Sequence, residues 1–379
     1  MNQKEYIGRY TVNNLKEILS KHNPKTIFLV TDKSSYEQCG AKSIFINILK
    51  NYNTIHFHDF EINPKFHDIE KGIKIFKENN CDFVIAVGGG SVIDVAKSVN
   101  ILTANNENPE SYIKNTKMIE NKGKPIVAIP TTSGGGGEVT HFAVVYLNNM
   151  KYSLAHNYIL PDYAIVDPQF LTSLPPYVTA YTGMDAIANA IESYWCIYSN
   201  DESKDYARKA IKLAMTNLPI AVNNPTEKSR EAMAKAAYLS GKAVNITKST
   251  ACHAISYPIS SYFGVPHGHA VALTLAQMLI YNSKISEEDL LDNRGVIYVR
   301  NIINELVDLI DTKDVEDASK KITKLMQDIG LNTRLSDLGI KTNEDIGIII
   351  KNGFNPDRVK NNPRLLTEEA LIEILECIR

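Results

Sequence analysis

Short apolar runs alternate with amphipathic stretches through the first half of the chain. Ile69–Asn79 has its apolar residues at helical spacing, whereas the runs around it are brief and continuous. Brief continuous apolar runs are typical of strands that are buried on both faces. Strands that alternate with helices favour a parallel sheet covered by helices on both faces. We therefore predict buried strands over Thr26–Thr31, Phe83–Val87, Ile126–Ile129 and Ala164–Val166.

The pattern changes after about Leu171, where strand signals become scarce. The pair Pro175–Pro176 marks a joint, and helical periodicity follows, as in Tyr206–Leu218 and Arg230–Val244. We predict an α/β Rossmann-like domain over residues 1–172 and an all-helical (all-α) domain over residues 173–379. Ligands of such proteins usually bind in the cleft between the domains.

Composition and charge narrow the classes of partner. Of the 379 residues, 44% are hydrophobic and 22% are charged, and the net charge is −2. This balance gives no electrostatic basis for binding nucleic acid or an acidic membrane surface. The sequence shows neither a long apolar run nor a signal peptide. Five dispersed cysteines without a CxxC pair predict a reducing, cytoplasmic setting.

A glycine-rich segment, Val87–Ser98 (VGGGSVIDVAKS), follows a predicted strand and opens a helix. Its glycines allow a sharp turn and bring backbone N–H groups close to an anion. The helix N-terminus adds unpaired donors and a favourable dipole. The same triplet also serves a plain strand–helix turn, and it does not match the GxGxxG dinucleotide fingerprint, so both interpretations stand at this point.

A second segment, Ile129–Thr140 (IPTTSGGGGEVT), also follows a strand and offers three hydroxyls before four glycines. Two such loops at the ends of parallel strands suit the pyrophosphate and ribose of a dinucleotide. Asp32 ends the first predicted strand, where a carboxylate can hold the adenosine ribose and favour NAD over NADP. The alternative is that Asp32 caps the next helix.

In the second half, Thr182–Cys196 (TGMDAIANAIESYWC) has the pattern of an amphipathic helix. Asp185 and Asn189 are four residues apart and therefore lie on one face. An aspartate on a helix is usually solvated or capping, so Asp185 alone does not indicate a metal site.

The segment Ala251–Leu273 supplies histidines around a turn. His253 is expected at the end of a helical run, and the chain is then expected to break and turn back at Pro258, Gly264 and Pro266, ahead of His267 and His269. A lone histidine is more often a core or surface residue than a ligand. Two histidines around a turn, together with Asp185, nevertheless form a two-histidine, one-carboxylate set that suits Fe(II) or Zn(II).

Taken together, these segments resemble the iron-containing alcohol dehydrogenase family. The matching stretches, from about Asp32 to Leu273 in the family's order, are GGGSVIDVAK, PTTSGGGGEVT, PDYAIVDP, TGMDAIANAIE and HAISYPISSYFGVPHG. The resemblance implies a dehydroquinate synthase-like fold with a dinucleotide domain and a helical metal domain. It also implies hydride transfer with NAD(H), a divalent metal such as Fe(II) or Zn(II), and a homo-oligomer, which we expect to be a dimer.

The resemblance also assigns residues by position. The implied metal ligands are Asp185, His253 and His267. The implied cofactor-binding residues are Asp32, Gly89, Gly90, Ser91, Asp94, Thr131, Thr132 and Lys151.

Two positions depart from the family's pattern. Asn189 stands where the family usually has a further metal-ligating histidine, and its amide oxygen is either a weak fourth ligand or leaves room for water. Tyr257 stands where many relatives carry an active-site histidine that does not bind the metal. A tyrosine there can donate or relay a proton, so Tyr257 and His267 are expected to act in catalysis, or Tyr257 only packs.

Within the family, the resemblance is greatest to reductases of phosphonoacetaldehyde, which implies reduction to 2-hydroxyethylphosphonate and a place in phosphonate metabolism. A phosphonate requires cations or N–H donors, and we expect these from Lys248, His141 and His269. Lys248 precedes His253 by five residues, about 140° around a straight helix, so its approach requires the long stem or a helix break. On a straight helix, Asn245 and Ser249 share the face of His253.

Three alternatives remain open. The substrate is another short-chain aldehyde or a primary alcohol; or the chain is a non-redox lyase on a related scaffold; or it binds nucleotide without catalysis because Asn189 abolishes metal binding. A lyase of the dehydroquinate synthase type requires several basic residues for its phosphorylated substrate, and the apolar surroundings of His253 disfavour it.

Overall fold

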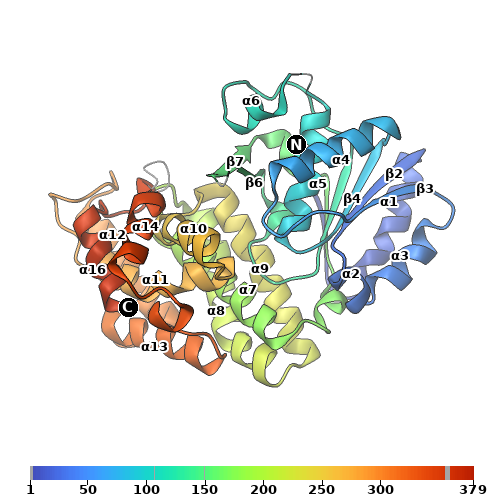
Figure 1. Cartoon of the computed structure of the whole chain (residues 1–379). Helices are drawn as coiled ribbons and strands as arrows, with labels where there is room; N and C mark the ends of the chain where they lie inside the picture. The colour runs from blue at the N-terminus through green and yellow to red at the C-terminus, as the bar shows by residue number, and fades with distance from the viewer. Residues whose placement is uncertain (1–2, 106, 149, 355–358) are drawn as a thin grey trace. The chain divides into compact units, whose positions relative to one another are not determined.

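The computed structural model describes residues 3–105, 107–148, 150–354 and 359–379. It divides into two compact units, Met1–Leu174 and Pro175–Arg379 (Figure 1). The first combines a sheet with helices and the second is helical, which confirms the predicted fold class.

The first unit is built on a six-stranded sheet with the order β1-β8-β5-β4-β2-β3, in which all neighbours are parallel. Its strands are β1 (Lys4–Ile7), β2 (Thr26–Thr31), β3 (Asn53–Phe57), β4 (Phe83–Gly88), β5 (Ile126–Pro130) and β8 (Tyr163–Val166). The four predicted strands are β2, β4, β5 and β8, and all are fully buried. The edge strands β1 and β3 were not predicted because most of their residues are partly or fully exposed.

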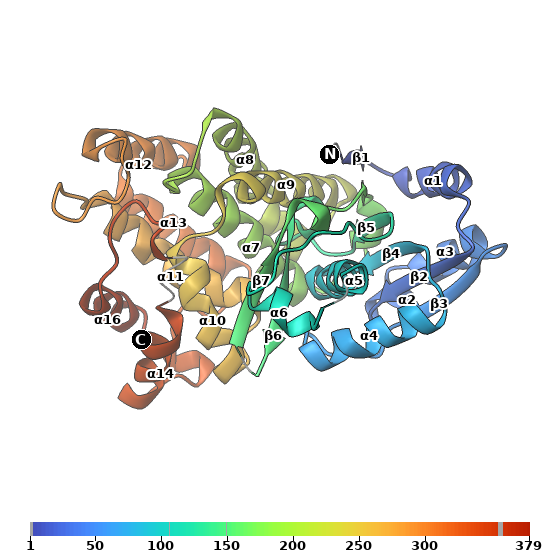
Figure 2. The same cartoon turned by 90° about the horizontal axis from the view of Figure 1, so that it is seen from above.

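Helices cover both faces of this sheet (Figure 2). They are α1 (Asn14–His22), α2 (Ser35–Gln38), α3 (Ala41–Leu49), α4 (Phe66–Glu78), α5 (Gly90–Thr103) and α6 (Pro109–Ile113). One apolar core joins α4 and α5 to one face, and a second joins α1, α2 and α3 to the other. The glycine-rich segments begin at the carboxyl ends of the buried strands β4 and β5. Because these strands are parallel neighbours, both segments lie at the same end of the sheet.

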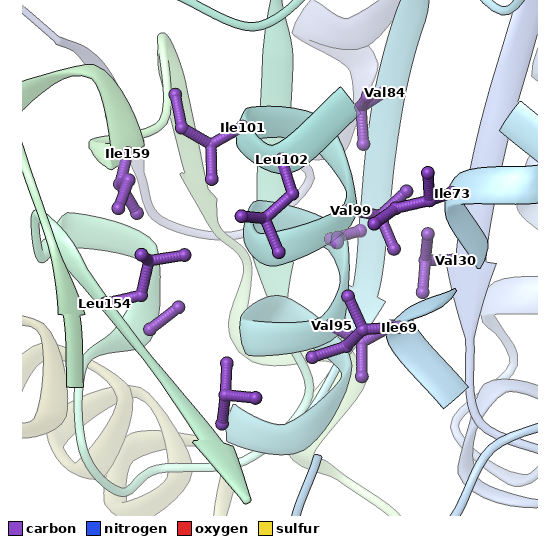
Figure 3. Packing of buried hydrophobic residues seen from close by; sticks show 14 of the residues in the cluster. Val30, Ile69, Ile73, Val84, Val95, Val99, Ile101, Leu102, Leu154 and Ile159 are labelled. Atoms are coloured by element: carbon purple, nitrogen blue, oxygen red, sulfur yellow. The ribbon is translucent and has the colours of Figure 1, made fainter. Parts of the chain in front are cut away.

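An antiparallel hairpin of β6 (Phe142–Leu147) and β7 (Met150–Ala155) was not predicted. In β6 partly buried and buried residues alternate, whereas β7 buries only Leu154, so the apolar signal of the hairpin is weak. Its buried residues join the core around α5, where Leu154 and Ile159 lie beside Ile101 and Leu102 (Figure 3).

Lys97 of α5 forms hydrogen bonds to the segment from Gly137 to Phe142, which leads into this hairpin. Its side chain is 1% exposed, and its ammonium donates to the carbonyls of Gly137, Thr140 and Phe142. Burial lowers the pKa of Lys97 to about 8, against the opposing charges of Asp94 and Glu138. The segment after β5 is therefore held by a buried cation as well as by apolar packing.

The second unit consists of helices. They are α7 (Pro176–Trp195), α8 (Asp201–Asn223), α9 (Glu227–Thr247), α10 (Ala251–Phe263), α11 (His267–Ser283), α12 (Val296–Ile310), α13 (Val315–Asp328), α14 (Asn343–Gly353) and α16 (Glu368–Cys377). Helix α7 packs against α8, α9, α11 and α12. Every residue from Gly183 to Trp195 is buried, so the predicted amphipathic pattern of this helix is wrong. Among the described residues, no helix is long and apolar enough to cross a membrane.

The predicted turn around the histidines needs two corrections. His253 lies in the first turn of α10, not at the end of a helical run. Pro258 lies inside α10, and the helix continues to Phe263. The chain turns back at Gly264, whose φ of 70° favours glycine, and Pro266 then precedes α11.

We expect Lys97→Met to destabilise the protein, because the buried acceptors around the ammonium lose their donor. Breaking a buried charge network of this kind costs roughly 3–5 kcal/mol. The measurement is the free energy of unfolding in urea, with Lys74→Met as the control, since the Lys74 side chain is 76% exposed. Equal stability of the two variants would show that Lys97 contributes little.

Candidate functional site

Three metal-binding side chains of the second unit lie together. One ligand atom from each of Asp185, His253 and His267 is within 4.8 Å of the others. They come from α7, α10 and α11. The rings of His253 and His267 have centroids 5.5 Å apart and are inclined at 68°. A carboxylate and two imidazoles at this spacing fit a divalent transition metal with open coordination positions.

His253 lies between two carboxylates of α7. Its Nε2 is 3.4 Å from Asp185 Oδ1, and its Nδ1 is hydrogen-bonded to Oε2 of Glu192. Glu192 is fully buried. A metal-ligating histidine commonly has a carboxylate on its other ring nitrogen, and Glu192 occupies that place relative to Nδ1 of His253.

The charges of this group favour a cation. Burial by itself lowers the pKa of His253, but the negative charge of Glu192 and the hydrogen bonds to Asp185 and Glu192 outweigh it and raise the pKa to about 9. Burial likewise raises the pKa of Glu192, but the charge of His253 and its hydrogen bond lower it overall. The two carboxylates therefore attract one positive charge, which a divalent metal can supply.

Gly268 allows α11 to approach α7 at the metal-binding cluster. A Cβ at this position would lie 2.0 Å from the backbone oxygen of Tyr181 and 2.8 Å from Cβ of Asp185. Backbone atoms cannot yield as a flexible side chain can, so only glycine fits here. His267, the preceding residue, begins α11 beside Asp185, and its Nδ1 lies 3.5 Å from Ser256 Oγ.

Asn189 lies one turn after Asp185 and is buried. Its amide nitrogen is 3.0 Å from the backbone oxygen of Asp185 and 3.2 Å from Oδ1 of that residue. Asn189 therefore supports the carboxylate of Asp185 in this structure. Ligation by its amide oxygen, the predicted fourth contact, stays a prediction.

The glycines of the first glycine-rich segment, between β4 and α5, do not form the sharp turn that the sequence predicted. None of Gly88, Gly89 and Gly90 has a positive φ. Gly88 is required for packing, because a Cβ there would lie 2.4 Å from a methyl of Val92. Apart from its chain neighbours and the backbone of its own helix, no described atom lies within 4 Å of the Cβ position of Gly90, so the backbone at the N-terminus of α5 is accessible to an anion.

Other predicted cofactor residues surround this loop. The hydroxyl of Thr131 is buried and has no hydrogen-bond partner among the described residues. Ser91 Oγ accepts from the backbone N–H of Asn63 at 3.2 Å.

Asp94 accepts from the N–H of Val144 at 3.1 Å. Burial raises the pKa of Asp94 to about 6, although the charges of Lys97 and Lys151 oppose the shift. The structure thus brings Asp94 and Lys151 together. Thr132 is near Gly89, 3.3 Å from its Cβ position.

Asp32 follows β2, as expected, and its carboxylate accepts from the backbone N–H groups of Ser34 and Ser35. These bonds hold the start of the short helix α2, whose N-cap residue is Ser34, so capping by Asp32 itself, the alternative interpretation, stays a prediction. A role at the adenosine ribose stays a prediction.

The predicted substrate residues come from both units. The ring of His269 is buried, and its Nε2 is hydrogen-bonded to the backbone oxygen of Asn332 at 2.7 Å. His141 belongs to the first unit and is partly buried. Tyr257 is partly buried on α10, one turn after His253.

Lys248 lies in the break between α9 and α10, with its side chain exposed. Its backbone has φ 66° and ψ 172°, a region that is essentially restricted to glycine and costs about 1–3 kcal/mol. The helix break that its approach to the site required is therefore present. Because of this break, the straight-helix register of Asn245 and Ser249 with His253 does not hold.

Sequence reasoning missed Glu192 and the contact made by Lys97. Glu192 lies seven residues after Asp185, which places both on nearly the same face of α7. This spacing predicts that the two carboxylates share a helix face. It does not indicate a role for Glu192 until His253 is placed between them.

The comparisons with known proteins agree across both units. A sequence model described as iron-containing alcohol dehydrogenase matches residues 2–168, and one described as the C-terminal part of that family matches residues 179–378. The 1,3-propanediol dehydrogenase of Citrobacter freundii is 31% identical over 92% of this chain and 90% of its own length. The NAD-dependent methanol dehydrogenase of Bacillus methanolicus is 28% identical over 98% of this chain and 96% of its own.

Among solved structures, the sulfoacetaldehyde reductase of Bifidobacterium kashiwanohense in complex with NAD+ is similar, with a TM-score of 0.88 and 30% identity. The match covers 99% of this chain and 96% of that one.

We expect Gly268→Ala to weaken metal binding, because the new methyl must push α11 away from α7 and move His267 from Asp185. The expected rise in the dissociation constant for Zn(II), measured by competition with a chromophoric chelator, is about tenfold or more. Gly347→Ala in α14 is the control, since no described atom outside its own helix backbone and its chain neighbours lies within 4 Å of its Cβ position. Unchanged Zn(II) affinity of Gly268→Ala would contradict this account of the helix contact.

Proposed function

The chain belongs to the iron-containing alcohol dehydrogenase family, and on this basis we propose that it reduces a short aldehyde that carries a phosphonate, with phosphonoacetaldehyde as the substrate and 2-hydroxyethylphosphonate as the product. It is an NAD-dependent oxidoreductase acting on alcohols and aldehydes. The lyase alternative is therefore set aside. The observation that carries the proposal is the cluster of Asp185, His253 and His267.

We assign the metal to these three side chains, with Asn189 supporting Asp185 or binding as a weak fourth ligand. The cofactor is assigned to the N-terminus of α5, where the backbone is accessible, and to the hydroxyl of Thr131, which is buried without a hydrogen-bond partner among the described residues. When bound, the metal supplies a Lewis acid for the substrate oxygen and NADH supplies the hydride.

The chain's own residues have three tasks in this proposal. Asp185, His253 and His267 fix the position of the substrate oxygen. Holding the reacting groups in the right geometry lowers the activation free energy substantially. Tyr257, one turn after His253, donates the proton that the product alcohol requires. Lys248 attracts the anionic end of the substrate, because its exposed ammonium precedes the first turn of α10.

Support for an anionic aldehyde comes from two sources. The sequence resembles phosphonoacetaldehyde reductases, and a structural relative of 30% identity is a sulfoacetaldehyde reductase. Sulfonate and phosphonate are both tetrahedral anions, so a related cationic contact can serve either. The second candidate is an uncharged short alcohol or aldehyde, which the relatives that oxidise methanol and 1,3-propanediol favour.

We expect His267→Ala to abolish turnover while NADH binding is retained, because His267 belongs to the second unit and the proposed cofactor residues to the first. Turnover is measured by NADH consumption and binding by NADH fluorescence. His67→Ala, which removes an exposed histidine of α4, is the control and should change neither. Full turnover of metal-stripped His267→Ala would refute the metal role.

The substrate class is tested by kcat/KM for phosphonoacetaldehyde, sulfoacetaldehyde and propanal, with Fe(II), Zn(II) or Mn(II) added in turn. We expect the phosphonate to be preferred. Lys248→Met should raise its KM about 10- to 100-fold, the worth of one charged hydrogen bond, without changing KM for propanal. Lys235→Met, an exposed position of α9, is the control. A preference for propanal would reject the anionic substrate and leave the dehydrogenase function intact.

A further inference from the structure

We propose that Glu192 is a positioning residue of the metal centre. It fixes which ring nitrogen of His253 carries a proton, and thereby directs the lone pair of Nε2 to the metal. This inference rests on the proposed function, because it concerns the same ligand set. It adds a residue that is not itself a ligand but on which ligation by His253 depends.

The two oxygens of Glu192 have different partners. Oε1 accepts from the hydroxyl of Thr250 at 2.7 Å, from the N–H of Cys252 at 2.8 Å and from the N–H of His253 at 3.4 Å. Oε2 faces Nδ1 of His253. Thr250 in turn accepts from the indole N–H of Trp195 at 3.0 Å. All of these contacts are buried, so each donor and acceptor has to be matched.

This arrangement determines the tautomer of His253. A neutral imidazole has one N–H and one lone pair. The ionised Glu192 can only accept, so Nδ1 must be the nitrogen that donates. The lone pair is then on Nε2, which lies 3.4 Å from Asp185 Oδ1 within the metal-binding cluster. Only this tautomer can bind a metal there, because a protonated nitrogen has no lone pair to offer.

A simpler role for Glu192 is that it caps α10. The N–H groups of Cys252 and His253 belong to the first turn of that helix, where intrahelical acceptors are lacking. That role uses Oε1 alone, whereas control of the tautomer uses Oε2. The two roles can therefore be separated by a change that affects one oxygen and preserves the other.

Glu192→Gln makes this separation. The backbone N–H groups of Cys252 and His253 cannot become acceptors, so the glutamine oxygen must occupy the position of Oε1. Its NH2 group must then face Nδ1 of His253. Nδ1 becomes the acceptor, and the neutral ring carries its proton on Nε2, pointing to Asp185. The shape and the helix cap are preserved, whereas the lone pair needed by the metal is lost.

The experiment measures the dissociation constant for Zn(II) of the full-length protein by competition with a chromophoric chelator, with NADH fluorescence as a second measurement. We expect Glu192→Gln to raise the constant roughly 10- to 100-fold and to leave NADH binding unchanged. Thr250→Val is the matched control, because it removes a buried hydrogen bond from the other oxygen of Glu192. The rise in its constant should be clearly smaller than that of Glu192→Gln, since this change leaves Oε2 of Glu192 and the tautomer of His253 as they are.

Wild-type affinity of Glu192→Gln, or an equal loss in Thr250→Val, would overturn the inference and leave only the capping role. Nitrogen NMR of the wild-type protein with labelled histidine and bound Zn(II) tests the same point without any variant. It should show a proton on Nδ1 of His253 and the metal on Nε2, and the reverse assignment overturns the inference. A wild-type protein that binds no Zn(II), Fe(II) or Mn(II) rejects the proposed metal centre itself, and this inference with it.

Discussion

Two carboxylates of one buried helix enclose the imidazole of His253, and the organisation of the second unit follows from this contact. Asp185 and Glu192 are seven residues apart on α7, nearly in line along its axis. Buried charges are tolerated only when they are paired and hydrogen-bonded. Helix α10 has to dock with its first turn against α7 to provide that pairing, and the close approach at Gly268 brings α11 to the same point. The fold of the unit and its chemistry thus depend on the same helix contacts.

The interior of the sheet could be predicted from the sequence, whereas its edges could not. Strands β2, β4, β5 and β8 are buried on both faces and therefore appear as uninterrupted apolar runs. Strand β3 has mixed exposure, and the hairpin of β6 and β7 covers a core on one side only. Helix α7 was predicted with the wrong character, because its neighbours bury the faces that an isolated helix would expose.

The site was predictable where residue type and resemblance carried the signal. Asp185, His253 and His267 are brought together as the resemblance implied. Their supporting contacts were not predictable, because they depend on distances that the sequence does not contain. Glu192 resembles any helix glutamate until His253 is placed beside it, and Lys97 resembles a surface lysine until the carbonyls of Gly137, Thr140 and Phe142 surround it. Asp32 shows a related ambiguity, since capping α2 and holding a ribose require the same carboxylate at the same strand end.

The backbone of Lys248 has a consequence for how such a protein changes over evolutionary time. Lys248 has a backbone conformation that glycine adopts at a lower energetic cost. Drift or laboratory selection for thermal tolerance alone would therefore tend to replace it by glycine, and each such replacement would remove an ammonium group from the entrance to α10. A lineage that keeps lysine here accepts a weaker fold in return for that charge. If Lys248 binds the anionic end of the substrate as proposed, stability and substrate recognition are opposed at this position of the chain.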